Sequence, residues 1–332
     1  METGGISAAA AYLKRLACTV QEELDEPKRP RDGNEEEEQM LDDLRCYRSN
    51  WTELWSEDFG DVEKRTELAP MRYTEGPVPR IVIVTDALEI FSFEVRELNG
   101  IFCWPINVFG FISVRDSLDR NRNYIFERTR DNCQTLTAED SSLVLTGPSR
   151  GVLVLDPVEF EIELRVKGTN PSEDKILSAE AFEYNGTTQR TWSGSLRNMM
   201  ISGVRSILEF KYAHLPLALE ATIKIWVSEG LTDFCGKFTA RNASINENVI
   251  LLDSRDEMVA ISNDGSIQLS RSVVVVDGDK GTLFVGAHAT RSRQSSYACT
   301  KFFPGKSGLS RDTLDVGFCR MSIEVAWSLI SI

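Results

Sequence analysis

The sequence predicts a mainly β protein that contains two tandem antiparallel β-sandwich units and one N-terminal amphipathic α-helix. Beyond about residue 80, short apolar runs alternate with a period of two, as β-strands do. The stretch SRGVLVLDP (149–157) is nearly repeated as SRSVVVVDG (270–278), whereas residues 36–57 show the period of a helix. These three observations predict the fold class.

Length and composition favour two globular units with an extension. The chain has 332 residues, of which 42% are hydrophobic and 27% charged, so it can bury a sizeable core. The formal net charge is −14, and residues 1–80 contain 19 acidic against 11 basic side chains. Because an acidic chain repels phosphate backbones and anionic lipids, we expect no nucleic-acid partner.

The cysteines and the apolar runs bear on location. No apolar stretch reaches the roughly 18 residues that a membrane-spanning helix needs, so we expect no membrane span. Seven cysteines without a CxxC pair are typical of reduced thiols, which predicts a cytoplasmic protein without a zinc site. The basic KRPR at 28–31 leaves a nuclear location as the alternative, although we prefer to interpret it as a solvated charge run.

The N-terminal quarter divides into three segments. Residues 1–35 are expected to form a flexible acidic segment, because the charged stretch within them has few apolar side chains to bury. Residues 36–57 form an amphipathic helix, and residues 58–80, rich in proline towards their end, an extended linker. The apolar stripe of the helix consists of Met40, Leu41, Leu44, Tyr47, Trp51, Leu54 and Trp55. We expect this stripe to pack on the protein's own sheet, with docking in a partner's groove as the alternative.

The remaining chain divides into two similar halves. The repeated stretch shares five identities at an offset of 121 residues, and GFISVRDSLDRNRNYIFERTRD (110–131) aligns with GKFTARNASINENVILLDSRD (236–256) with a single gap. An internal duplication explains both matches and predicts a first unit at 81–213 and a second at 214–332. The alternative is one larger sandwich whose halves are only superficially similar.

The repeated stretch also predicts a contact. VLVL and VVVV place apolar side chains on both faces of a strand, so both faces of the sheet must be covered there. Packing of the two units on each other, or of the helix on one unit, would cover the second face. The charged strand ends, Arg150 with Asp156 and Arg271 with Asp277, are expected to pair with neighbouring loops, and a ligand-binding role is the alternative.

Motifs for chemistry are sparse, and we expect neither catalytic nor cofactor-binding residues. His214 and His288 are the only histidines, which excludes a multi-histidine metal site, and no GxSxG motif accompanies them. We expect each histidine to be a satisfied residue of a sheet. The Gly-Lys-Ser at 305–307 lacks the spacing and the following helix of a phosphate-binding loop.

Aspartates in the first half raise the alternative of a calcium site. Asp116, Asp119 and Asp131 are predicted to lie in loops, but calcium requires six to eight oxygen ligands, and the second half has Asn242 and Ile245 in place of two of these aspartates. We therefore expect no metal.

Several phrases carry a family resemblance. APMRYTEGPVPR, WPINVFGFISVRDSLDRNRNYIF, LTGPSRGVLVLDPVEFEIELRVKG and MSIEVAWSLIS resemble a plant family, found mainly in grasses, that is known as a domain of unknown function. The resemblance covers about 69–332. It implies a β-rich domain, and in some members fusion to ribosome-inactivating N-glycosidase domains and a link to defence.

The N-glycosidase hypothesis can be compared with the residues. Its site resembles a helix with Glu-Ala-x-Arg, whereas this chain has EAFE at 180–183 and EATIK at 220–224, both in strand patterns and without the arginine. We therefore predict a non-enzymatic interaction or regulatory protein of plant cells, related to defence, with an unidentified protein partner or self-association. The alternative is an rRNA N-glycosidase-type or other hydrolase.

Overall fold

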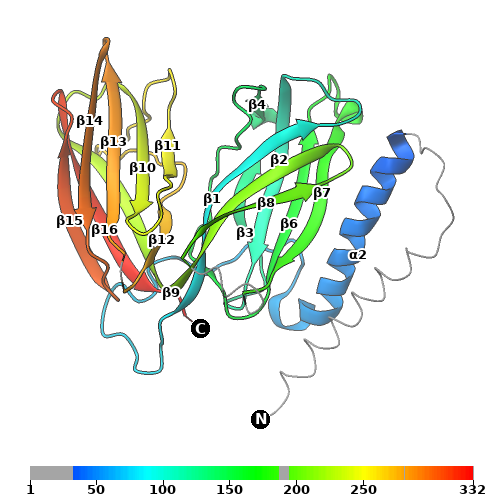
Figure 1. Ribbon diagram of the computed structural model, residues 1–332, viewed down its shortest axis with the longest axis horizontal. Coiled ribbons are helices and arrows are strands. Elements are labelled where there is room, and N and C mark those ends of the chain that lie inside the picture. The colour runs from blue at the N-terminus through cyan, green and yellow to red at the C-terminus, as the bar shows by residue number, and fades with distance from the viewer. Residues whose placement is uncertain (1–32, 187–193, 280, 332) are drawn as a thin grey trace.

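The chain folds into antiparallel β-sheets with one long α-helix at the side, as Figure 1 shows. The computed structural model describes residues 33–186, 194–279 and 281–331. The predicted fold class, mainly antiparallel β with an N-terminal helix, is confirmed. No helix in the described ranges is long and apolar enough to cross a membrane.

The first unit contains two facing layers of strands. One layer has the order β3 (Asn123–Arg128), β2 (Ile106–Arg115), β6 (Val158–Val166) and β7 (Lys175–Tyr184), with β4 (Gln134–Leu136) also paired to β2. The other layer has the order β8 (Leu196–Ser202), the first half of β9 (Ser206–Gly230), β1 (Thr85–Leu98) and β5 (Val152–Leu153). Two short 3₁₀ turns, Arg130–Asn132 and Pro171–Glu173, lie in its loops.

The second unit repeats this strand order. One layer has the order β11 (Val249–Asp253), β10 (Cys235–Asn242), β13 (Leu283–Arg291) and β14 (Gln294–Phe302). The other has β15 (Gly308–Asp315), β16 (Cys319–Leu329), the second half of β9 and β12 (Val273–Asp277). Each strand of the second unit therefore has a counterpart at the same place in the first. An internal duplication would leave this pattern, and it stays a prediction.

Strand β9 belongs to both units. It pairs with β1 between Ser206 and Ala218 and with β16 between Leu219 and Gly230. The predicted boundary at 213/214 therefore lies inside a continuous strand. Leu217, in an irregularity of the β1 register, has φ 47°, a left-handed conformation that is strained for leucine and lies where β9 passes from one unit into the other.

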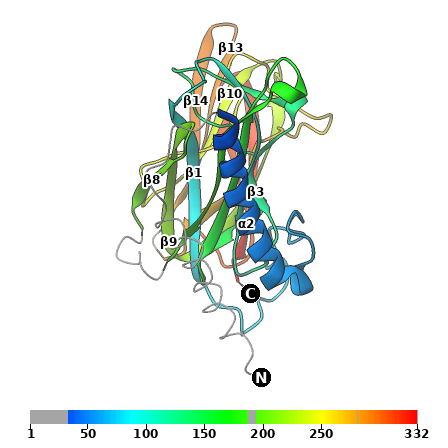
Figure 2. The same ribbon diagram turned by 90° about the vertical axis from the view of Figure 1, so that its right-hand side faces the viewer.

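Helix α2 (Gly33–Phe59) lies along the outer face of the β3-β2-β6-β7 layer, as Figures 1 and 2 show from two directions. Met40 and Leu44 are buried against Ile176 and Ala179 of β7. Trp51 is 2% exposed and donates a hydrogen bond from Nε1 to the Arg120 carbonyl, at 3.2 Å. The prediction that the stripe packs on the protein's own sheet is confirmed.

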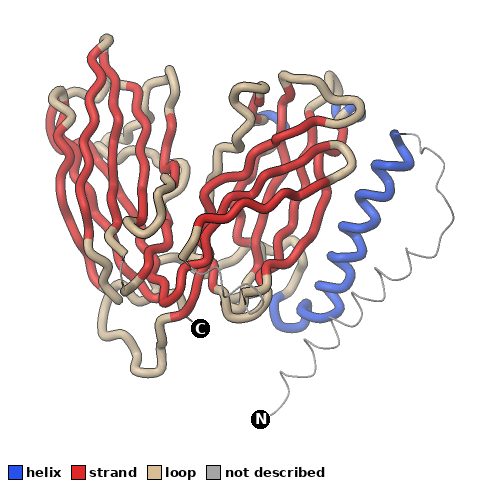
Figure 3. Tube along the Cα trace, in the orientation of Figure 1, coloured by secondary structure: helices blue, strands red, loops and turns tan. Residues whose placement is uncertain are grey.

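The segment between α2 and β1 touches both units, and Figure 3 shows it in tan below the strands. At its start, the Thr66 hydroxyl donates to Asp119 of the first unit at 2.7 Å. Further on, the Met71 amide donates to Glu220 at 2.7 Å and the Thr74 hydroxyl to the Trp327 carbonyl at 2.9 Å. The predicted extended linker is thus a strap, residues 60–84, that is hydrogen-bonded to both units.

Candidate functional site

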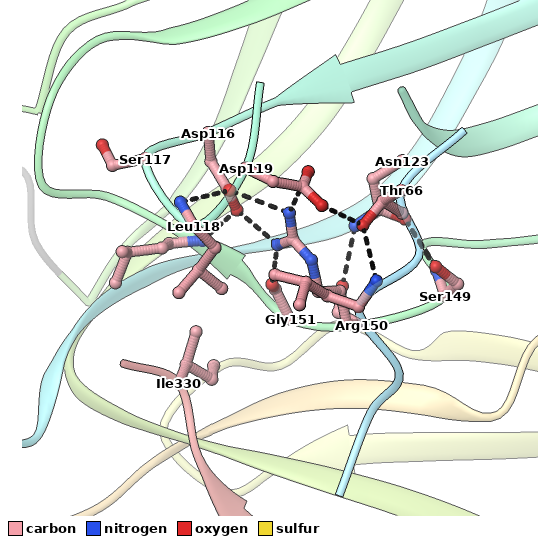
Figure 4. A network of polar contacts seen from close by, with 12 residues as sticks. Thr66, Asp116, Ser117, Leu118, Asp119, Asn123, Ser149, Arg150, Gly151 and Ile330 are labelled. Atoms are coloured by element: carbon pink, nitrogen blue, oxygen red, sulfur yellow. Dashed lines mark hydrogen bonds and ion pairs between the residues drawn. The ribbon is translucent and has the colours of Figure 1, made fainter. Parts of the chain in front are cut away.

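The arginine of the first repeated stretch lies at the centre of a buried polar network (Figure 4). Arg150 is 1% exposed and donates to both oxygens of Asp116, at 2.7 and 2.9 Å, and to Asp119 at 3.2 Å. Burial alone would lower the pKa of Arg150, but the two carboxylates outweigh burial and raise it. The guanidinium is therefore a permanent cation between the two aspartates.

This network changes the interpretation of the calcium alternative. Asp116 and Asp119 do converge, but the Arg150 guanidinium occupies the place between them, and Asp116 also accepts the amides of Leu118 and Leu153. Asp131 is exposed in the turn after β3 and does not join them. Across residues 33–186, 194–279 and 281–331, no group of three or more His, Cys, Asp or Glu side chains is placed to hold a metal ion.

The arginine of the second repeated stretch also turns inwards, but it crosses to the other unit. Arg271 donates to Glu89 of β1 at 2.8 Å and to the Ile90 carbonyl at 2.6 Å. The second oxygen of Glu89 accepts the Val275 amide of β12. Burial raises the pKa of Glu89 to about 7, against the opposing attraction of Arg271. A buried ion pair thus ties β1 of the first unit to β12 of the second.

A matching contact runs in the opposite direction. Glu220, in the half of β9 that belongs to the second unit, accepts the Gly151 amide from the first repeated stretch at 2.7 Å. Its other oxygen accepts the Met71 amide of the strap. Each unit therefore sends one buried glutamate to the repeated stretch of the other, since Glu89 and Glu220 occupy corresponding strands.

The repeated stretches are covered on both faces, as predicted. Leu153 of β5 packs into the core of the second unit, with Ala87 and Phe91 of β1, whereas Val152 packs into the core of the first. Val273 to Val276 are each at most 3% exposed. Contact between the units covers the second face. The ligand-binding alternative fails for the arginines, because both are buried and paired inside the protein.

Between the units the same arrangement leaves a cleft of about 650 Å³. Its first-unit side includes Phe91 and Glu94 of β1, Lys211 of β9 and the loop at 140–145. Its second-unit side includes Lys237 of β10, Ser270 and residues of β11 and its flanking loops. We call this the inter-unit cleft. It is the candidate functional site, because pockets of ligand size occur preferentially between packed units.

The charges in the inter-unit cleft form pairs. Lys211 and Glu247 join the two units across it at 3.4 Å, and Arg255 and Asp140 do so at 2.5 Å. Lys237 pairs with Asp253 within the second unit at 2.9 Å. Burial alone would raise the pKa of Asp253, but the hydrogen bonds and charges of Lys237 and Arg255 together outweigh burial and lower it. The cleft therefore offers cations and carboxylates side by side.

The residues weighed for catalysis lie apart from this cleft. His214 is buried, its Nδ1 2.9 Å from the Tyr184 hydroxyl and its Nε2 3.0 Å from Asp86, whereas His288 is exposed on β13. The two EA motifs lie in β7 and β9, as predicted. His214 is thus the satisfied sheet residue that we expected, and His288 faces outwards.

Another group of arginines and glutamates meets beneath α2. Glu161 of β6 is fully buried and accepts from Arg48 of the helix at 2.7 Å, from Arg115 at 3.0 Å and from Arg122 at 2.7 Å. Burial alone would raise the pKa of Glu161, but these arginines outweigh burial and lower it. Because the helix covers this group, its carboxylate is not accessible to a substrate in this conformation.

Sequence reasoning missed the two glutamates and the cleft. Glu89 and Glu220 each follow a leucine and interrupt an apolar strand, and this shared Leu-Glu pair was a usable signal. The cleft residues carry no local signal, since they come together only when the units pack.

Comparison with known proteins places the chain in a family. The sequence matches the domain of unknown function DUF6598 over residues 87–325. The chain belongs to this family. The matched range begins in β1 and ends in β16, so a single DUF6598 domain comprises both units, while α2 and the strap lie before it. No curated protein matches the sequence significantly.

Solved structures similar to the DUF6598 chain include tandem C2 domains. The pair of C2 domains of extended synaptotagmin 2 matches at 8% identity with a TM-score of 0.26, covering 81% of this chain and 100% of that one. The calcium-bound form of the same pair matches at 9% identity with a TM-score of 0.23, covering 77% and 100%. Similarity at this level carries no argument about function.

Proposed function

We propose that this DUF6598 protein is a non-enzymatic binding protein whose ligand site is the inter-unit cleft. The observation that carries the proposal is the construction of the cleft: both units line it, and it contains charges of both signs. Buried contacts between the units, Glu89 with Arg271 and Glu220 with Gly151, hold the two walls in place. A preformed site of this kind favours binding, because little ordering is required when a ligand enters.

The biological setting is a further part of the proposal. The sequence resemblance supports a protein of plant cells with a regulatory or defence-related role. The acidic composition and the reduced cysteines support a cytoplasmic or nuclear protein partner rather than a nucleic acid. Self-association through the same cleft is the alternative to a separate protein partner.

A matched pair of charge reversals tests the site. Lys211→Glu places a carboxylate beside Glu247 in the cleft, whereas Lys224→Glu makes the same change on an exposed position of the same strand. We expect affinity capture from plant extract, quantified by mass spectrometry, to lose specific partners with Lys211→Glu and to retain them with Lys224→Glu. Equal capture by both variants would place the binding site elsewhere.

The enzymatic alternative requires its own assay. Ribosomes incubated with the full chain should release no adenine above the level of a buffer control. Adenine release that depends on the protein would overturn the non-enzymatic proposal.

A further inference from the structure

We infer that the inter-unit cleft binds a zwitterionic ligand with an apolar body, namely an amino acid or a short peptide with free termini. This inference rests on the proposed function for the choice of the inter-unit cleft, and it names a small ligand of that cleft in place of a protein partner. It follows from the size of the cleft, from the mixture of groups that line it and from the way in which its charges are paired.

The size and the lining suit a small organic ligand. A volume of about 650 Å³ falls within the range of roughly 300–1,000 Å³ that is usual for such sites. Phe91, Leu143 and Ile250 provide apolar surface, and Ser142 and Asn248 provide hydrogen-bonding groups. An apolar side chain and a peptide backbone would both find matching partners here.

The charges decide the class of ligand. The Lys211–Glu247 and Arg255–Asp140 pairs join the two units at the cleft, so an occupant meets a cation and a carboxylate next to each other in each pair. A ligand with a single anionic group that binds Lys211 or Arg255 places its negative charge beside the carboxylate of Glu247 or Asp140. A zwitterion offsets this repulsion, because its carboxylate can accept from Lys211 or Arg255 while its ammonium donates to Glu247 or Asp140.

A charged group of the ligand can take the place of one member of such an ion pair, because the pairs are partly exposed. The side chains of Lys211 and Glu247 are 26% and 30% exposed, and those of Arg255 and Asp140 are 50% and 45% exposed. Such pairs contribute little to stability, so ligand groups can replace them at low cost. The buried Glu89–Arg271 pair, in contrast, stays in place and keeps the units together.

Glu94 adds a further carboxylate to the lining of the cleft, and two neighbouring side chains of the first unit fix its position. It accepts from Ser141 at 3.0 Å and from Arg96 at 2.9 Å. Its charge adds to those of Asp140, Glu247 and Asp253, against the three cations Lys211, Lys237 and Arg255. A mixed lining with an excess of one carboxylate repels polyanions, which excludes nucleotides as the favoured class.

The test compares three forms of one tripeptide against the full chain by isothermal titration calorimetry. Trileucine carries both charges, N-acetyl-trileucine lacks the ammonium, and trileucine amide lacks the carboxylate; free leucine is added to distinguish an amino acid from a peptide. We expect each blocked form to bind about tenfold more weakly than trileucine, because each loses one charged hydrogen-bonding group. No measurable binding of either zwitterion, or equal affinity of the blocked and free forms, would overturn the inference.

Variants then locate the binding. The double variant Lys211→Met/Arg255→Met removes the cations proposed to bind the carboxylate, and Lys224→Met/Arg293→Met makes the same replacements at exposed positions outside the cleft lining. We expect the first variant to bind trileucine and its amide equally and the control to keep the tenfold preference. A preference retained in the first variant would contradict the assignment.

The outcomes also separate this inference from the proposed function. If no zwitterion binds but Lys211→Glu still loses its partners, the ligand class is wrong and the cleft remains the binding site. If the Lys211→Glu variant captures the same partners as the wild type and trileucine does not bind, both the ligand class and the proposed binding site are wrong.

Discussion

At the scale of single residues, buried charges have a structural role. Arg150 and Arg271 stand at the same place in the repeated stretches, and both are paired with carboxylates inside the protein. Removal of one member of such a pair leaves the other charge buried and without compensation. Residue-scale predictions therefore concern stability, whereas changes in the exposed cleft concern binding.

The Glu89–Arg271 pair gives the first prediction. At pH 8, where Glu89 is mostly ionised, Glu89→Ala should lower the free energy of unfolding by about 3–5 kcal/mol, since Arg271 would keep a buried charge without its carboxylate. Urea unfolding followed by circular dichroism measures the change. Glu97→Ala, on the exposed end of the same strand, should change the free energy by less than about 0.5 kcal/mol. A similar loss in both variants would show that the pair is not critical.

The pKa of Glu89 gives the second prediction. Because burial raises this pKa to about 7 in the folded protein, from 4.5, the folded state holds the proton more tightly than the unfolded state does. The resulting stabilisation is fully present below pH 4.5 and is lost as the pH rises through about 7. Glu180 has its pKa raised to about 7 by burial and by Asp43, and adds a change of the same sign.

Unfolding free energies at a series of pH values test this. Wild-type protein should lose stability between about pH 5 and pH 8, and Glu89→Gln should lose less over the same interval, because the titrating group is absent. Identical pH profiles would mean that Glu89 does not titrate in this range.

At the scale of elements, a helix covers a sheet face whose sequence pattern predicts exposure to solvent. The run VEFEIELRV in β6 alternates as a strand with one wet face would. Instead Glu161 is fully buried beneath α2, where Arg48 neutralises it. The face is polar because Arg48 of the helix, together with Arg115 and Arg122 of the sheet layer, takes the place of water at this carboxylate.

Docking of the helix gives the third prediction. Leu44→Ala should cost about 2–5 kcal/mol of the docking free energy, since the residue is 1% exposed against β7. Hydrogen–deuterium exchange should rise in α2 and along β7, while Glu57→Ala, on the exposed side of the helix, leaves exchange unchanged. An unchanged helix in Leu44→Ala would mean that docking depends on the polar contacts alone.

Local patterns predicted the elements well and their partners poorly. The helix at 36–57 was found as Gly33–Phe59, and the alternating runs became strands, because both depend on side-chain spacing over a few residues. Glu89 and Arg271 lie 182 residues apart, so no local signal joins them. The boundary at 213/214 could not be anticipated as the middle of a strand, since β9 has the same apolar pattern in both units.

At the scale of the whole molecule, the two units are joined by elements that belong to both. β9 runs through both, the strap is bonded to both, and Leu153 of the first unit lies in the core of the second. The inter-unit cleft depends on these ties, because its walls belong to different units.

The shared core gives the fourth prediction. Leu153→Asp should destabilise both units together, because its carboxylate would enter the core of the second unit without a partner. Hydrogen exchange should rise in β13 and β16 as well as in β1. A rise confined to the first unit would show that the cores are independent.

Differential scanning calorimetry of the full chain tests the central claim most directly. If the units form one body that holds the cleft, the protein should unfold in a single transition whose calorimetric enthalpy equals the van't Hoff enthalpy. Two resolved transitions, one for each unit, would contradict it.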